Sequence, residues 1–189
     1  MEEITTTGIV VGGEDSGEAD RIVRLLTPSG VISVRMRGVK KEKAKLKFAA
    51  MPFSFCRYVL LKRGGFYSVK TADQEESLFG VTSSPEKYIT GSLMLETAAV
   101  ASGGSDSADI FISLLTSLKD LIYSDVHPYI AGLSFICDLL VRGGHLTRSI
   151  ASAASDGDLT VPLARTRLKG YASLFEKKYY TKLKSLPMI

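Results

Sequence analysis

The sequence SFCRYVLLKRGGFYSVKTAD, residues 54–73, contains two strand-like runs that meet at Gly64 and Gly65. Apolar and β-branched residues fill both runs, and glycines adopt positive φ at low cost, so we expect a hairpin. Three similar runs precede it: TTTGIVVGG (5–13), DRIVRLLTP (20–28) and GVISVRMRG (30–38). Five short strands in succession are typical of a small closed barrel such as an OB-fold, although an SH3-like barrel has a similar strand count.

A strongly basic segment, RMRGVKKEKAKLK, follows at residues 35–47. Its seven Lys or Arg are accompanied by the single acid Glu42, so the segment repels itself unless an anion binds to it. A basic loop between strands, edged by aromatic residues, indicates a nucleic-acid groove more than a solvated tail. Its cations are Arg35, Arg37, Lys40, Lys41, Lys43, Lys45 and Lys47.

Aromatic residues near this loop could stack on bases or fill the barrel. Phe48, embedded in the basic loop, is the best candidate for stacking. Phe66 and Tyr67 are neighbours on one strand, so we expect one of them to point outward. Aromatic residues expected mainly in the core are Phe53, Phe55 and Tyr58.

The charge distribution supports binding to a polyanion. The chain of 189 residues carries a formal charge of only +4, yet residues 35–70 hold eleven Lys or Arg and one acid. Residues 165–184 form a second basic region, with seven Lys or Arg and one acid. Two separate basic patches on a nearly balanced chain are expected of a protein that binds nucleic acid.

The second half of the sequence has helical periodicity. We expect helices over residues 85–102, 108–124, 127–144 and 165–185, whereas residues 145–164 lose the pattern. The fold class expected is therefore α+β: a five-stranded OB-fold nucleic-acid-binding domain over residues 1–80 and a helical domain over residues 81–189.

Catalytic and metal-binding motifs are not found. Cys56 and Cys137 lie in apolar surroundings and are expected to be buried thiols, and His127 and His145 are expected at the surface or at helix ends. We therefore expect no enzyme, no cofactor and no metal site. The acids Glu14, Asp15, Glu18 and Asp20 fit a polar loop between strands better than a magnesium-dependent nuclease, which we keep as a minor alternative.

Targeting and membrane segments are also not expected. The N-terminus, MEEITTTG, is acidic and lacks the apolar region of a signal peptide. No apolar run approaches the length of about 18 residues that a membrane span needs. We expect a cytoplasmic protein with no membrane partner.

The order of motifs in the first 80 residues resembles the N-terminal domain of the RecO family of DNA repair proteins. The motifs are T-x-GIV (6–10), GEADRIV (17–23), LLTP (25–28), R-G-x-K-K-x-K-x-K-L (37–46) and PF (52–53). The helical half is also similar to that family: FICDLLVRGGHL (135–146) resembles the segment before its zinc loop, and FEKKYYTKLKSLPMI (175–189) resembles its terminal helix.

The resemblance implies a recombination mediator that binds single- and double-stranded DNA and anneals complementary strands. It also implies two protein partners, the acidic tail of single-stranded DNA-binding protein and RecR, and a role in loading RecA. Carried over by position, the DNA-contacting residues are those of the basic loop together with Arg57, Lys62 and Arg63.

One departure concerns the zinc site that many RecO proteins hold with four cysteines. The corresponding residues 147–164, TRSIASAASDGDLTVPLA, contain no Cys, so we expect a degenerate zinc loop around residues 145–164 and no zinc. The chain also looks short for the family.

Two functions follow. The first is a DNA-binding mediator that acts through the basic loop. The alternative is an interaction adaptor, in which the helical domain binds an acidic C-terminal peptide such as the tail of single-stranded DNA-binding protein. Candidate residues for that second site are Arg142, Arg148, Arg165, Arg167 and Lys169.

Overall fold

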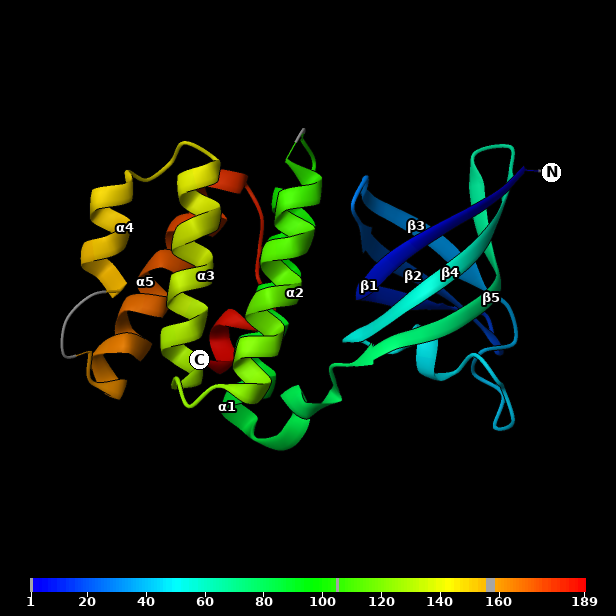
Figure 1. Cartoon of the computed structure of the whole chain (residues 1–189), viewed down its shortest axis with the longest axis horizontal. Coiled ribbons are helices and arrows are strands. Elements are labelled where there is room, and N and C mark those ends of the chain that lie inside the picture. Colours follow the sequence, from blue (N-terminus) through cyan, green and yellow to red (C-terminus); the bar gives the residue numbers. More distant parts are fainter. Residues whose placement is uncertain (1, 105, 156–158) are drawn as a thin grey trace. The chain divides into compact units, whose positions relative to one another are not determined.

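Five strands form a closed barrel in the computed structural model, which describes residues 2–104, 106–155 and 159–189 (Figure 1). The strands are β1 (Glu2–Ser16), β2 (Asp20–Thr27), β3 (Gly30–Met36), β4 (Ser54–Arg63) and β5 (Phe66–Ser77). Their order is β1-β2-β3-β5-β4, closed by antiparallel pairing of β4 with β1. Among the described strands, β3 and β5 are the only pair that runs in parallel. This strand order is that of an OB-fold, which confirms the expected fold class and removes the SH3-like alternative.

The hairpin expected at Gly64 and Gly65 is confirmed, and a second hairpin forms at Gly30. Gly30 joins β2 to β3 with φ of 113°, and Gly64 and Gly65 join β4 to β5 with φ of 55° and 85°. Residues with a Cβ rarely adopt such angles, so glycine is the natural residue for these turns. The β4–β5 turn thereby places Arg63 opposite Phe66 as the last pair of the ladder.

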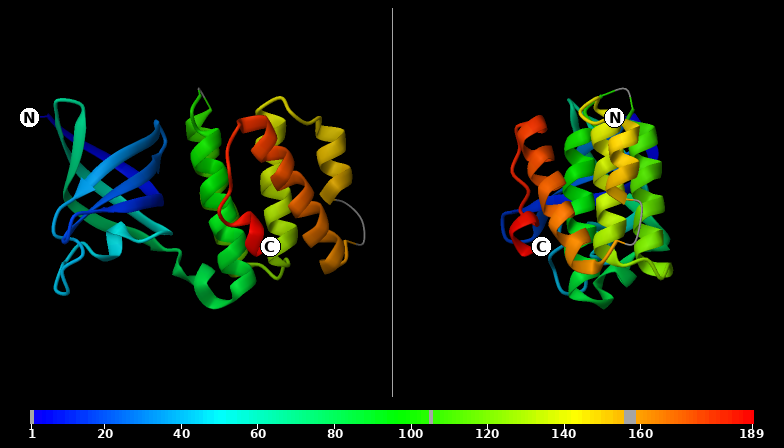
Figure 2. Two further views of the ribbon diagram at one scale, coloured as in Figure 1. Left: turned by 180° about the vertical axis from the view of Figure 1, so that it is seen from behind. Right: turned by 90° about the vertical axis from the view of Figure 1, so that its left-hand side faces the viewer.

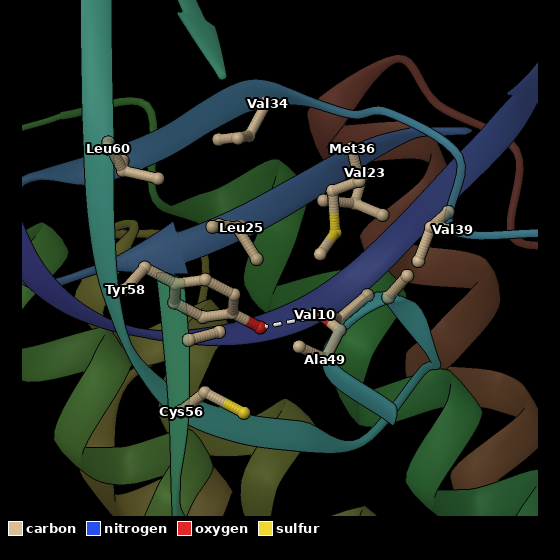
Figure 3. Close-up of a cluster of buried hydrophobic side chains, with 12 residues drawn as sticks. Val10, Val23, Leu25, Val34, Met36, Val39, Ala49, Cys56, Tyr58 and Leu60 are labelled. Atoms are coloured by element: carbon tan, nitrogen blue, oxygen red, sulfur yellow. Dashed lines mark hydrogen bonds between the residues drawn. The ribbon is translucent and has the colours of Figure 1, made fainter. Parts of the chain in front are cut away.

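Figure 3 shows the hydrophobic core inside the barrel. Val23 and Leu25 from β2, Val34 from β3 and Leu60 from β4 are all fully buried. The Tyr58 hydroxyl also lies inside and donates a hydrogen bond of 2.8 Å to the carbonyl of Ala49, in the short 3-10 helix η1 (Phe48–Ala50). The core therefore extends to the chain that follows the basic loop.

Five α-helices are found among the described residues that follow the barrel. They are α1 (Pro85–Ala101), α2 (Ser107–Tyr123), α3 (Pro128–Arg142), α4 (Arg148–Ser155) and α5 (Val161–Tyr179), with 3-10 turns η2 (Phe79–Ser83) and η3 (Leu186–Met188). Two compact units result: Met1–Phe79 with Ser102–Phe111, and Gly80–Ala101 with Ile112–Ile189. The division into functional domains at residue 80 stays a prediction.

The helix α3 lies at the centre of the second unit and packs against α1, α4 and α5 (Figure 2). Its residues Leu133, Ile136, Leu139 and Leu140 are fully buried. The helices approach closely at Gly132, where a Cβ would lie 2.7 Å from Cγ2 of Thr90 in α1. This crossing needs a residue without a side chain.

Two expectations about the C-terminal region are wrong. The last helix was expected over residues 165–185, but α5 begins at Val161, preceded by Thr160 as N-cap, and ends at Tyr179. Tyr180 adopts the left-handed conformation (φ 50°) and stops the helix, and the chain then turns back. Residues 145–164 were expected to lack periodic structure, but they contain α4. Residues 156–158 of the expected degenerate zinc loop lie outside the described residues.

Among the described residues, none of the helices combines the length and the apolarity needed to cross a membrane.

Candidate nucleic-acid interface

A groove of about 1160 Å³ runs along the barrel where β3 and β5 meet. These two strands pair over a short stretch, in which Val34 lies opposite Tyr67 and Arg35 lies opposite Ser68. Side chains of β2, β3, the start of the basic loop and the β4–β5 hairpin line the groove. Its lining is apolar along the strands, cationic at Arg35, Arg37 and Arg63, and acidic at Glu14 of β1.

Strand alternation explains why arginines line this groove. In β3, Val34 and Met36 are buried in the barrel, so Arg35 and the following Arg37 are exposed. Arg63 ends β4 and is exposed beside the hairpin turn. The sequence therefore brings three of the expected DNA-contacting residues to one groove from two separate strands.

The start of the basic loop is anchored to the turn between β1 and β2. The amide of Gly38 donates a hydrogen bond of 2.9 Å to Asp20 Oδ1, and Arg35 Nη2 lies 2.8 Å from Asp20 Oδ2. The Gly38 hydrogen bond and the Arg35 guanidinium hold the pKa of Asp20 below its ordinary value. The amide of Lys40 donates to the carbonyl of Ala19 at 3.0 Å. The loop thus begins from a fixed position.

A second acid, Asp15, forms a salt bridge with Lys40, in which Oδ2 of Asp15 lies 2.8 Å from Nζ of Lys40. The hydrogen bond from Lys40 lowers the pKa of Asp15. The expected polar loop is thus wrong in its bounds: Glu14 and Asp15 lie in β1, Asp20 begins β2, and only Glu18 lies in the turn between the strands. Asp15 and Asp20 hold the start of the basic loop. The described residues contain no cluster of three or more His, Cys, Asp or Glu side chains suited to a metal ion.

Apolar contacts fix both ends of the loop. Val39 is 4% exposed and joins the barrel core, and Leu46 packs partly against the same core. The segment between them projects from the barrel (Figure 1) and carries Lys41, Lys43 and Lys45. Rigid ends and an exposed cationic centre suit a loop that contacts a phosphate backbone.

The expected DNA-contacting cations fall into two groups. Four of them form salt bridges with acids: Arg35 with Asp20, Lys40 with Asp15, Arg57 with Glu75 and Lys62 with Glu2. Within the described ranges, the other cations of this set form no salt bridge; they are Arg37, Lys41, Lys43, Lys45, Lys47 and Arg63. A phosphate can bind the second group without displacing a carboxylate.

The aromatic residues differ sharply in exposure. Phe66 is 81% exposed, whereas its neighbour Tyr67 is half-buried, so the expectation that one of the two points outward is confirmed. Phe48, our first candidate for stacking, packs partly against the barrel core. Phe53 and Tyr58 are buried, as expected. Phe66 lines the groove, a position that the sequence pattern does not reveal.

The arginines proposed for a peptide site are largely occupied by contacts within the helical unit. Arg142 forms a salt bridge with Asp138 one helical turn away. Arg167 donates a hydrogen bond of 2.7 Å to the carbonyl of Ala154 and so joins α5 to α4. Arg165 binds the carbonyl of Ile189. Arg148 and Lys169 are exposed on α4 and α5. Their role in partner binding stays a prediction.

The remaining candidates have structural roles. Cys56 and Cys137 are buried, which raises the pKa of both thiols, that of Cys137 to about 11. His127 caps α3 by accepting from the amide of Tyr129, and His145 follows the end of α3 and contacts Tyr179 edge-on. The expectations of buried thiols and helix-end histidines are confirmed.

The closed barrel and its cationic, aromatic-edged groove define an OB-fold protein. The family model described as "Recombination protein O N terminal" matches residues 1–78. The curated DNA repair protein RecO of Streptomyces griseus is 28% identical over 148 residues, covering 73% of this chain and 60% of that protein. Residues 1–78 therefore match the N-terminal domain of the RecO family, and the chain is similar to curated RecO proteins.

Other curated RecO proteins match a smaller part of the chain. That of Bacillus subtilis is 29% identical over 118 residues, or 60% of this chain and 46% of that protein. That of Acetivibrio thermocellus is 28% identical over 97 residues, which is 51% of this chain and 39% of that protein. The chain therefore spans 39% to 60% of the length of these three relatives.

Proposed function

We propose that this chain is a DNA-binding mediator of recombinational repair that holds single- and double-stranded DNA by its phosphates and promotes annealing. The observation that carries the proposal is the groove between β3 and β5, in which Arg37 and Arg63 line a partly apolar surface beside the exposed ring of Phe66. The similarity to RecO proteins supports the same role, because the curated relatives are named DNA repair proteins.

The binding energy would come mainly from the basic loop. Each lysine that contacts a phosphate releases condensed cations, and this gain does not depend on sequence. Lys41, Lys43, Lys45 and Lys47 are all exposed, so they can reach a backbone without structural change. The anchors at Gly38 and Val39 keep the loop beside the groove.

Annealing follows from where the strand would be held. Contacts to phosphates leave the Watson–Crick edges of the bases free to pair with a second strand. A mediator with this surface would also lower the repulsion between two DNA backbones brought together. We include single-stranded DNA-binding protein and RecR as proposed partners, with loading of the recombinase as the outcome.

Fluorescence anisotropy with a labelled single-stranded 30-mer tests the proposal at several salt concentrations. Replacing Lys41, Lys43, Lys45 and Lys47 by Ala should weaken binding to all sequences alike and reduce the salt slope by about 0.7 for each lost single-strand contact. A salt slope that stays at the wild-type value would show that the basic loop is not part of the DNA-binding surface.

A matched variant separates local contacts from net charge. The control variant replaces four exposed lysines of the helical unit by Ala: Lys169, Lys177, Lys178 and Lys184. The proposal expects a smaller loss of affinity from this variant than from the loop variant. Equal losses would mean that total charge, not the barrel groove, determines binding.

The adaptor function is kept as the alternative. Arg148 and Lys169 are exposed and could receive an acidic peptide, whereas Arg142, Arg165 and Arg167 are engaged within the helical unit. Titration of a peptide with an acidic, apolar C-terminus against R148A and K169A variants tests it. Weaker peptide binding with unchanged DNA binding would assign this second function to the helical unit.

A further inference from the structure

We propose that the groove between β3 and β5 binds unpaired bases, with Phe66 as the stacking platform, so that the barrel prefers single strands to duplex. This inference rests on the proposed function and deepens it by separating the groove from the basic loop. The loop lysines would bind phosphates of any strand, whereas the groove would recognise the faces of bases.

The exposure of Phe66 is the first observation. A phenylalanine ring that is 81% exposed gains little from the fold, since most of its apolar surface stays in water. The ring is nevertheless held in a defined place: Phe66 forms the last ladder pair with Arg63, directly after the glycine turn. Its ring is therefore available to a ligand at the first residue of β5.

The surroundings of Phe66 are the second observation. Arg63 and Arg37 line the same groove as Phe66, and both lack a salt bridge within the described part of the chain. Tyr67 lines the groove next to Phe66, and Nζ of Lys62 lies 6.0 Å from the centre of the Tyr67 ring. Between these groups, Val31 and Ile32 of β3 and Val69 of β5 provide apolar lining. Aromatic rings, apolar lining and free guanidinium groups together match a nucleotide, which has an apolar base face and an anionic backbone.

The physical difference between single and double strands gives the selectivity. Bases inside a duplex are covered on both faces by their neighbours, so no face is free to stack on Phe66. A single strand offers such faces at every position, and stacking tolerates any sequence because every base has a π-face.

The test compares three labelled 30-mers: a single strand, the same length of duplex, and a strand of abasic sugar-phosphate units. The variant F66A should lose about 5- to 150-fold in affinity for the single strand. Its affinity for the duplex and the abasic strand should stay within about twofold of wild type, because those substrates use the loop lysines. Its salt slope should not change, since no phosphate contact is lost.

Two further variants sharpen the result. F66W keeps an aromatic face and should restore single-strand affinity, whereas F66L keeps apolar area without a π-face and should not. Tyr180 is 97% exposed in the helical unit, so Y180A controls for the loss of any exposed ring and should bind all three strands like wild type.

The outcomes distinguish this inference from the proposed function. If wild type binds none of the three 30-mers at low salt, the proposed function itself fails. If wild type binds DNA but F66A matches it on the single strand, the groove does not bind bases and this inference alone is overturned. An equal loss on all three substrates overturns it as well, because that pattern reflects a disturbed hairpin.

Discussion

The amide of Gly38 donates a hydrogen bond of 2.9 Å to the carboxylate of Asp20, eighteen residues earlier in the chain. The second oxygen of this carboxylate accepts from Arg35, which lines the groove. One acid therefore positions both a groove arginine and the first turn of the basic loop. This arrangement holds a self-repelling segment next to the barrel without neutralising its exposed lysines.

Replacing Asp20 by Ala should loosen the basic loop while leaving the barrel folded. The amides of residues 38–47 should exchange with solvent faster than in wild type, and the buried strand amides should not. D20N keeps an oxygen for the Gly38 amide but loses the charge, so its effect should be smaller. Hydrogen exchange measured residue by residue checks this, with E18Q as the control in the adjacent turn, where Glu18 is exposed. Unchanged exchange in D20A would show that Asp20 does not anchor the loop.

The same carboxylate should give the loop an acid transition. The pKa of Asp20 is lowered from 3.8 in the folded protein, so its stabilising contribution is complete above pH 3.8. That contribution is lost as the pH falls through the lower folded pKa. The chemical shift of the Gly38 amide should therefore be constant from pH 7 to 5 and should titrate with a midpoint below pH 3.8. A shift that titrates near pH 6 would contradict this assignment, and D20N should abolish the transition.

Much of the barrel could be predicted from the sequence because its signals are local. Glycines at positions 30, 64 and 65 mark the turns, and short β-branched runs mark the strands. The C-terminal helix was predicted less well, since its end depends on Tyr180 adopting a left-handed conformation, which the sequence does not signal. The helix α4 is eight residues long, which is too short for helical periodicity to be recognised.

Gly132 of α3 should tolerate no side chain. An added Cβ would lie 2.7 Å from Cγ2 of Thr90 and 3.2 Å from Cδ2 of Leu168, so α1 or α5 would have to shift. We expect G132A to lower the free energy of unfolding of the helical unit by about 1–3 kcal/mol. Urea unfolding followed by far-ultraviolet circular dichroism measures this change.

Gly170 provides the control for that variant. It lies inside α5, is exposed, and has open space where a Cβ would be. G170A should raise the free energy of unfolding by about 0.5–1 kcal/mol, because alanine loses less entropy in a helix than glycine. Equal effects of the two substitutions would mean that the crossing at Gly132 is not tight.

The groove could be predicted only in part. The basic loop is evident in the sequence as a run of charge, and its placement between strands indicated DNA binding. The pairing of particular lysines and arginines with acids depends on tertiary contacts: Lys40 of the loop pairs with Asp15 of β1, and Arg57 pairs with Glu75 between β4 and β5. Phe48 and Phe66 are both phenylalanines near cations, and only the fold shows that Phe48 packs on the core whereas Phe66 is exposed.

Tyr58 should stabilise the barrel through its hydroxyl as well as its ring. The hydroxyl donates a hydrogen bond of 2.8 Å to the carbonyl of Ala49, and both residues are fully buried. In Y58F this carbonyl loses its partner in an apolar interior, so we expect the barrel to lose about 1–3 kcal/mol of stability. Hydrogen exchange of the β2 and β4 core amides under mildly destabilising conditions measures the loss.

The position of Ala49 makes this substitution informative about the loop. Because η1 follows the basic loop directly, Y58F should also increase exchange at residues 46–50 more than at the β4–β5 turn. Y180F removes a hydroxyl from a tyrosine that is 97% exposed and should change neither region. Faster exchange throughout the barrel without a local excess at residues 46–50 would show that the Tyr58 hydroxyl stabilises the core but does not hold the end of the loop.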